Sequence, residues 1–461
     1  MLVSAAVTRK RSSSSSVKLF VIASVATLVG CGPTADVGVA EQEWILDLAG
    51  LEVAAPLAGA PDERIRVLAM SREQVDAGNA ERDFVAVAVD EVGTEEWRTS
   101  LGRGTPPLAL GSGPSVGPEG GMWACLGDEA TRVTATGKLA WSADVCGDYQ
   151  APGACWGRSQ ALAPSGHYVV VGRKQVDGFE ANTLAHFVPV ARAVASDGTL
   201  AWERDLGQPS ACEGQVLDHD RGTEVESIAI DGAGDVVVGC DVCGEGPSIV
   251  RLSVDNANVV SAWPVPWRLS MFDDFTEYQR GPVVGASAVW VGRYELGDQR
   301  SWNLAEAALP LDVTTAPLWY GEALVAFEPR FPPAPDERAS IYWNGERTPI
   351  DAESDGYDIG MEDGELIAVD EDENLVLGFP ALDPEKPELP RQLALISRSG
   401  EVVWYDDQVV FTHWDPLVFE GRVVFASVEG QLVARSGPYV AVAEGWAHKR
   451  GSQSGTFAAA R

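Results

Sequence analysis

Basic residues are scarce in this sequence, and their scarcity limits the kinds of partner it can have. The 461 residues include 34 lysines and arginines against 68 aspartates and glutamates. Four of the basic residues and none of the acidic ones lie in the first 30 positions, so the rest of the chain has a formal charge of 30 minus 68, or −38. Such a field repels nucleic acids and anionic lipid surfaces. We therefore expect no binding to nucleic acid.

Long apolar runs are also scarce. The run LFVIASVATLVG (19–30) has 12 residues, which is too short to span a bilayer, and no longer run follows it. It comes after a basic, serine-rich stretch (9–18), and this order is typical of a signal peptide. We predict a signal peptide over residues 1–30 and a short tether over 31–40.

The end of this run has a more specific pattern. Leu28-Val29-Gly30-Cys31 resembles the bacterial lipobox. The resemblance implies cleavage before Cys31 and a lipid (diacylglycerol, with palmitate-type acyl chains) on its sulfur, so the membrane is reached through the anchor alone. Gly32 rather than aspartate follows Cys31, which favours the outer membrane of the cell envelope, on its periplasmic or its surface face. The alternative is an ordinary signal peptide, with Cys31 an incidental thiol.

Helical periodicity is hard to find after residue 40, whereas short β-branched runs bounded by Gly, Asp and Pro are frequent. One phrase recurs in which glycine precedes tryptophan by four residues, at Trp97, Trp141, Trp202 and Trp404. Looser versions surround Trp44, Trp263 and Trp319. A turn followed by a buried run alternates with this phrase, at 163–172, 231–240, 370–378 and 419–427. The chain is therefore predicted to be all-β, with a repeat of about 40 to 60 residues, the size of a propeller blade.

The Gly-to-Trp phrase resembles the repeat of the PQQ-like (quinoprotein) β-propellers, a family that includes BamB-like lipoproteins. The resemblance covers residues 41–446 and implies four-stranded blades with each Trp packed between neighbours. We expect eight blades, one of them with SIYWNGERTPI (340–350) as its outer strand; seven is the alternative. The segment 421–444, expected to hold three inner strands, would pair with EQEWILDLAG (41–50) to close the ring. Residues 447–461 are predicted to be a disordered tail. The alternative fold is an antiparallel sandwich.

Six cysteines follow Cys31, and an even number in an oxidising compartment indicates three disulfides. They are Cys125, Cys146, Cys155, Cys212, Cys240 and Cys243. Fifteen pairings are possible; because the six fall into two groups of three, an odd number of bridges must join the groups. We favour Cys155 with Cys212. A redox or metal pair at Cys240 and Cys243 is the alternative.

The acidic segment DAESDGYDIGME (351–362) is a candidate calcium loop. Asp351, Glu353, Asp355 and Glu362 occupy ligand positions of the EF-hand pattern, with Gly356 at the turn. Position three is Glu, Asp358 stands where an apolar residue is usual, and no flanking helices are evident. The alternative is a solvated hairpin tip.

Catalytic motifs are absent. The five histidines show no metal-binding spacing, and no nucleophile elbow or phosphate loop is present. The family resemblance suggests a quinone-dependent dehydrogenase as one possible activity, but the sequence has no adjacent Cys-Cys pair and no matching catalytic Asp. We therefore expect that the protein is not an enzyme and that it binds no cofactor apart from the possible calcium. The predicted function is binding or scaffolding of an envelope or extracellular protein. The alternative is an enzyme with a quinone-dependent or hydrolytic site in the propeller channel.

Overall fold

The fold is described from a computed structural model of the chain. The chain falls into two compact units, residues 1–37 and 38–461, and every described residue belongs to the second unit. The described residues are 42–72, 82–104, 113–126, 129–145, 159–175, 186–206, 210–211, 225–240, 248–264, 283–284, 289–293, 300–303, 318–320, 323–328, 339–350, 365–379, 391–411, 416–427 and 430–440. In these ranges, no helix has the length and apolar character needed to cross a membrane.

The described strands form eight antiparallel sheets. We number seven of them I to VII in chain order and call the eighth the closing sheet. Sheet I has β2 (Leu51–Val53), β4 (Ile65–Ser71), β5 (Arg82–Val89) and β6 (Glu95–Gly104). The short strand β3 (Ala58–Gly59) also pairs with β4, and the 3-10 turn η1 (Pro61–Glu63) lies between β3 and β4. Sheet II has β7 (Ser115–Val116), β8 (Met122–Leu126), β9 (Glu129–Val133) and β10 (Leu139–Asp144). Sheet III has β11 (Ser159–Leu162), β12 (Tyr168–Gln175), β13 (His186–Val194) and β14 (Leu200–Asp205), with β15 (Ser210–Ala211) beside β13.

The remaining sheets follow the same order of strands. Sheet IV has β16 (Val225–Ile230), β17 (Val236–Cys240), β18 (Ser248–Leu252) and β19 (Val259–Pro264), and sheet V has β20 (Val283–Val284), β21 (Val289–Arg293) and β22 (Arg300–Asn303). Sheet VI has β23 (Leu318–Tyr320), β24 (Ala323–Glu328), β25 (Ser340–Trp343) and β26 (Glu346–Pro349). Sheet VII has β27 (Glu365–Val369), β28 (Leu375–Phe379), β29 (Arg391–Ile396) and β30 (Val402–Phe411). The closing sheet has β31 (Leu417–Phe419), β32 (Arg422–Ala426), β33 (Gln431–Ser436) and β1 (Gln42–Asp47).

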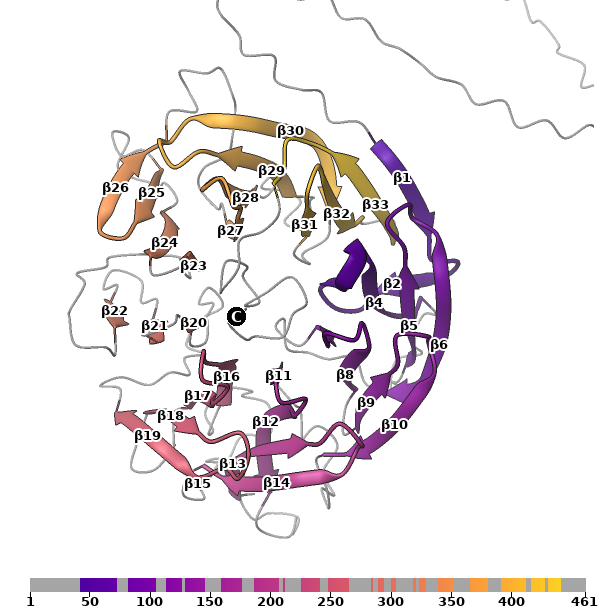
Figure 1. Cartoon of the computed structure of the whole chain (residues 1–461), viewed down its shortest axis with the longest axis vertical. Coiled ribbons are helices and arrows are strands. Elements are labelled where there is room, and N and C mark those ends of the chain that lie inside the picture. The colour runs from indigo at the N-terminus through magenta and orange to yellow at the C-terminus, as the bar shows by residue number, and fades with distance from the viewer. Residues whose placement is uncertain are drawn as a thin grey trace, which may run out of the picture. The chain divides into compact units, whose positions relative to one another are not determined.

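Successive sheets lie side by side around a ring (Figure 1). From sheet I to sheet VII, an inner strand of each sheet contacts the first strand of the next. Two apolar clusters join sheet VII to the closing sheet and the closing sheet to sheet I. The cores therefore lie between sheets, where the buried runs VVV of β12 and β17 pack. This arrangement is a β-propeller, as predicted. The number of blades stays a prediction, since sheet V has three described strands instead of four.

The outer strand of the closing sheet comes from the start of unit 38–461. β1 pairs antiparallel with β33, with Trp44 opposite Ala434, so the predicted closure by both ends of the chain is confirmed. One detail was wrong: the segment 421–444 does not supply all three inner strands. The first is β31, which precedes it, and the described residues Tyr439 and Val440 lie outside any strand.

The predicted tryptophan contacts between neighbouring sheets are confirmed for four tryptophans. Each indole Nε1 donates to a carbonyl on the third-to-fourth-strand turn of the next sheet, and the pairs are Trp44 to Glu91 (3.3 Å), Trp97 to Ala135 (2.8 Å), Trp141 to Ser196 (3.0 Å) and Trp202 to Val254 (2.6 Å). Gly198, with φ +90°, lies under Trp141, and a Cβ there would be 2.7 Å from the indole Cγ. In three of the four phrases the glycine therefore receives the Trp of the preceding sheet, whereas Gly400 of the fourth phrase lies against Pro349 O.

A β-bulge accompanies these contacts. In six sheets the pairing register between the outer strand and its neighbour shifts within a few residues of the tryptophan, for example between Leu139 and Trp141. A bulge turns the side chain that follows it and increases the local twist. It also makes an outer edge less suitable for pairing with another chain.

Two predictions for residues 318–350 need correction. Trp319 was expected on an outer strand, but it lies in β23, the first strand of sheet VI. The stretch 340–350 holds two strands, β25 and β26, and only β26 is the outer one. Trp319 has no glycine four residues before it, but neither do Trp44 of β1 and Trp263 of β19, which lie on outer strands, so a tryptophan in a looser phrase does not by itself identify the outer strand.

Candidate functional site

Most of the predicted site residues lie outside the described residues. These are the lipidation site Cys31, the cysteines Cys146, Cys155, Cys212 and Cys243, and the calcium-loop residues Asp351, Glu353, Asp355 and Glu362. Cys125 lies on β8, 4 % exposed, in an apolar cluster with Trp123, Val145 and Tyr168. Cys240 is the last residue of β17. The disulfides and the calcium site stay predictions.

The strand order gives the ring two different edges. In an antiparallel four-stranded sheet, the connections between strands one and two and between strands three and four lie at one edge, and the others lie at the opposite edge. The first edge, which we call the short-turn edge, has hydrogen-bonded turns of six residues or fewer, such as 90–94, 134–138, 195–199 and 253–258. The second, the long-connection edge, joins most strands through longer segments, including 145–158 between β10 and β11, with short exceptions at 48–50, 127–128, 412–416 and 427–430.

The strands on either side of the predicted cysteine and calcium-loop positions end at the long-connection edge. Cys146 and Cys155 fall between β10 and β11, and Cys212 directly follows β15, which pairs with the start of β13 at this edge. Cys240 ends β17 there, and the segment 351–362 falls between β26 and β27. The strands that flank all of these positions thus end at the same edge of the ring. Sequence reasoning placed the connections with Cys155 and Cys212 on one face, and the described strand ends agree with it.

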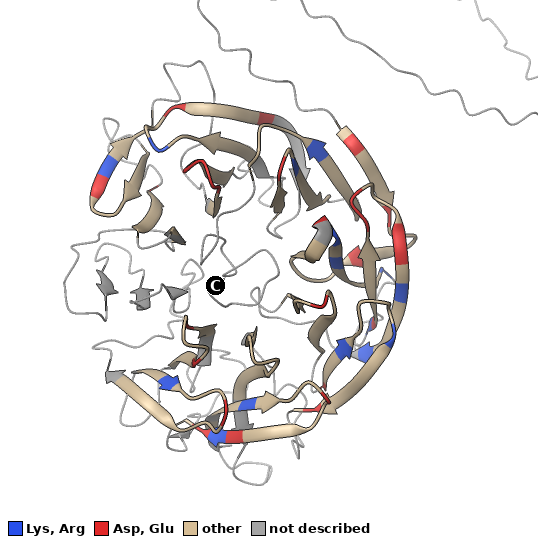
Figure 2. Cartoon of the chain, in the orientation of Figure 1, with Lys and Arg blue, Asp and Glu red and all other residues tan. Residues whose placement is uncertain are grey.

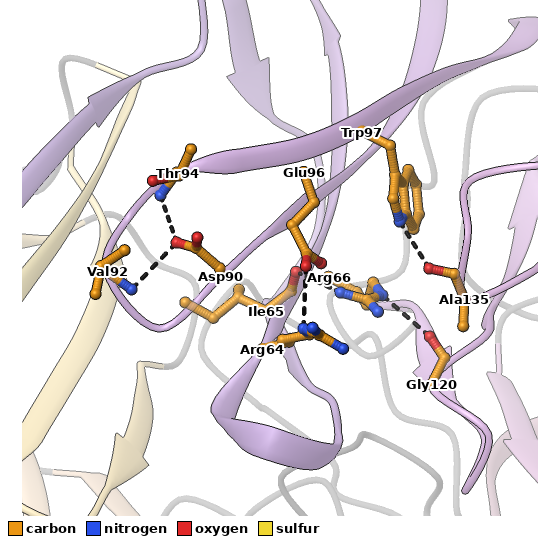
Figure 3. A network of polar contacts seen from close by, with 10 residues as sticks. All are labelled: Arg64, Ile65, Arg66, Asp90, Val92, Thr94, Glu96, Trp97, Gly120 and Ala135. Carbon is orange, nitrogen blue, oxygen red and sulfur yellow. Dashed lines mark hydrogen bonds and ion pairs between the residues drawn. The ribbon is translucent and has the colours of Figure 1, made fainter.

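Figure 3 shows the polar contacts that shape the short-turn edge between sheets I and II. Asp90 Oδ1 accepts from the amides of Val92 (3.1 Å) and Thr94 (2.6 Å), which fixes the turn before Trp97. Aspartate suits this position because its side chain can replace a backbone acceptor in a turn. The turn therefore aims Trp97 at sheet II.

Arg66 is the most buried charged side chain at this junction, with 1 % of its surface exposed. Its Nε donates to Gly120 O (3.1 Å) in sheet II, and its guanidinium lies 5.2 Å from the Trp97 ring centroid (Figure 3). Burial lowers the pKa of Arg66 from its ordinary value, while nearby Glu96 opposes this change. Arg64 Nε lies 3.1 Å from Glu96 Oε1, at the surface. The hydrogen bond from Arg66 to Gly120 O joins sheet I to sheet II, so the role of Arg66 is structural.

Other arginines repeat this role at further junctions. Arg132 donates to Ser196 O (2.7 Å) in sheet III, pairs with Glu119 (2.9 Å) and lies over the Trp123 ring. Arg422 of the closing sheet donates to Glu91 O (2.6 Å) in sheet I. These arginines were not predicted from the sequence. An arginine inside a β-branched run, as in RIRVLAM (64–70), is the signal that could have identified Arg66.

Acidic residues are frequent on the turns and outer strands (Figure 2). The turn 370–374 is the densest described group, and Asp370 within it is fully buried. Asp370 accepts from Asp372 N (3.0 Å), Asn374 N (2.8 Å) and Asn374 Nδ2 (3.0 Å), yet burial still raises its pKa. Burial and the acidic turn likewise raise the pKa of Tyr320, whose hydroxyl donates to Glu371 O (3.3 Å). The described part of the chain holds no group of three or more side chains suited to a metal ion.

The sheets, their closure and the docked tryptophans define the class: a β-propeller of antiparallel sheets. Solved structures similar to this chain include BamB from Moraxella catarrhalis (10 % identity, 86 % of this chain and 100 % of that one, TM-score 0.46) and the Pan2 WD40 domain from Neurospora crassa (8 %, 88 % and 98 %, 0.42). The β-propeller domain of a protease from Pyrococcus furiosus is also similar (11 %, 77 % and 99 %, 0.37). Because these TM-scores are below 0.5, the fold follows from the strand pairing and no function follows from the likeness. No family model and no curated protein sequence matches the chain.

Proposed function

We propose that this protein is a lipid-anchored β-propeller of a bacterial cell envelope that binds or scaffolds another envelope or extracellular protein through its long-connection edge. The observation that carries the proposal is the difference between the two edges. Tight turns at the short-turn edge are held by the tryptophan and arginine contacts, whereas the longer segments all join strands at the other edge. Binding residues are concentrated on such segments when a rigid scaffold positions them.

The charge of the chain narrows the class of partner. With a formal charge of −38 after residue 30, the surface favours a partner that presents basic residues. At the long-connection edge, Asp47, Asp144 and Asp205 occupy equivalent exposed positions, each three residues after a docked tryptophan. A protein with a basic surface is therefore the partner chemistry that this edge supports.

Face-specific photocrosslinking tests the proposal. A photoreactive residue replaces Asp144 or Asp205 at the long-connection edge, and Val92 or Glu371, both exposed, at the short-turn edge as controls. We expect one discrete adduct with an envelope protein from the first two positions and none from the controls. Adding 0.5 M salt should weaken it, because charge pairing between surfaces is screened. Adducts from the controls alone, or from no position, would contradict the proposal.

The proposed outer-membrane anchor has its own test. Cys31→Ala removes the sulfur to which the lipid is attached. The variant should move from the membrane fraction to the soluble fraction and lose its crosslinked adduct if the partner is reached only from the membrane. A Cys31→Ala chain that still sediments with membranes would contradict the anchor without affecting the binding edge.

A further inference from the structure

The closing sheet differs from the others in one connection. Its third and fourth strands, β33 and β1, come from opposite ends of the unit, so no turn joins them. In sheets I, II and III that turn holds the glycine under the preceding tryptophan, for example Gly137 under Trp97. Trp404 of sheet VII faces the closing sheet and has no such turn to dock on.

Residues 437–440 occupy this place. Tyr439 is 3 % exposed, and its ring meets the Trp404 ring edge to face, with centroids 5.0 Å apart and planes at 70°. A Cβ on Gly437 would lie 2.7 Å from Tyr439 Cε2 and 3.3 Å from Trp404 Cζ2, so glycine lets the two rings close. Gly437 therefore plays the part that Gly137 plays in sheet II.

Backbone hydrogen bonds fasten this segment to the turn between β31 and β32. Gly421 N donates to Tyr439 O (2.8 Å), and Gly437 N donates to Gly421 O (2.9 Å). Beside the rings, Arg435 Nε lies 2.6 Å from Asp406 Oδ2, which joins β33 to β30 of sheet VII. Burial, with Asp406 nearby, raises the pKa of Tyr439 well above its ordinary value and keeps the phenol neutral. Within the described residues its hydroxyl has no hydrogen-bond partner, so the ring carries the contact.

We infer that residues 437–440 form a latch that replaces the missing turn of the closing sheet, and that the docking of Tyr439 on Trp404 keeps β33 and β1 in the ring. The latch is separate from the proposed binding edge. It lies at the short-turn edge, where β33 ends and β1 begins. Because an edge-to-face aromatic pair stabilises a contact beyond the area that it buries, loss of the Tyr439 ring should destabilise the strands nearest to it.

Two truncations of the mature chain test the latch. A chain ending at Val440 keeps the latch and loses residues 441–461, whereas a chain ending at Ser436 loses both. The readout is amide hydrogen exchange followed by mass spectrometry. The chain ending at Val440 should exchange like the full chain. The second should exchange at least about tenfold faster in β1, β33 and the start of β30, with sheets II and III within about twofold. Equal exchange in the two truncations would overturn the inference.

Point variants keep the inference testable if the shorter chain does not fold. Tyr439→Ala should reproduce the local acceleration, and Tyr439→Phe should retain protection because it keeps the ring. Tyr168→Ala is the matched control, since Tyr168 is a buried tyrosine packed 5.5 Å from Trp123; it should accelerate exchange around β12 instead. The inference is wrong if Tyr439→Phe behaves like Tyr439→Ala, or if Tyr439→Ala accelerates exchange equally in all sheets.

Discussion

Substitution of the glycine under a docked tryptophan tests how the repeated phrase works. In Gly198→Ala the new Cβ would lie 2.7 Å from Trp141 Cγ and 2.9 Å from Cδ2, at a residue with φ +90°. The left-handed backbone costs alanine about 1–2 kcal/mol. Displacing the indole adds about 1–3 kcal/mol of overpacking. Losing its 3.0 Å hydrogen bond to Ser196 O adds about 0.5–1.5 kcal/mol. We expect a total loss of about 2.5–6.5 kcal/mol in the free energy of unfolding.

Gly50→Ala is the matched control. Gly50 has φ +86°, and its Cβ would meet no atom within 4 Å, so only the backbone cost of about 1–2 kcal/mol applies. The assay is urea unfolding followed by far-UV circular dichroism, which does not depend on the environment of one tryptophan. At unchanged slope the shift in midpoint reports the stability change. Equal losses in the two variants, within about 0.5 kcal/mol, would refute the docking argument.

Three further results are expected. Arg66→Met should lower the free energy of unfolding by about 1–3 kcal/mol because Gly120 O loses its buried donor, whereas half-exposed Arg64→Met should cost below about 1 kcal/mol; equal losses in urea unfolding would contradict this. Ala49→Gly should stabilise by about 1 kcal/mol, because Ala49 has φ +53° and is exposed; an unchanged or lower Tm would contradict it. Burial raises the pKa of Asp370, so the folded state binds the carboxyl proton more tightly than the unfolded state, and stability falls as pH rises from about 4 through the folded pKa. Asp370→Asn does not titrate, so its stability relative to wild type should increase over that range. A pH-independent difference between the two proteins would contradict the reasoning.

The repeat could be predicted from the sequence because one physical requirement recurs at one spacing. In three phrases a turn glycine with positive φ lies four residues before a tryptophan that contacts the next sheet, and these glycines are Gly93, Gly137 and Gly198. The spacing does not show which neighbouring sheet each tryptophan contacts. Trp97 and Trp141 dock on the glycine of the next phrase, not on their own, and the bulge beside the outer-strand tryptophan arises in the pairing with the third strand of its sheet.

The errors have the same cause. Trp319 was assigned from the tryptophan alone, but its strand begins a sheet because β24 and β25 pair after it. The residues around Tyr439 resemble a strand because valine and tyrosine favour one. No strand partner remains for them, because β1 takes the outer place in the closing sheet. Arg66 was missed because a buried charge reveals itself only through the carbonyl and indole that surround it.

The claim that this propeller works from a lipid anchor is tested most directly by mass spectrometry of the N-terminal peptide of the protein isolated from bacterial membranes. We predict a peptide that begins at Cys31 and carries the mass of a diacylglyceryl group, with residues 1–30 removed. An unmodified Cys31, or a mature N-terminus elsewhere in the chain, would contradict it.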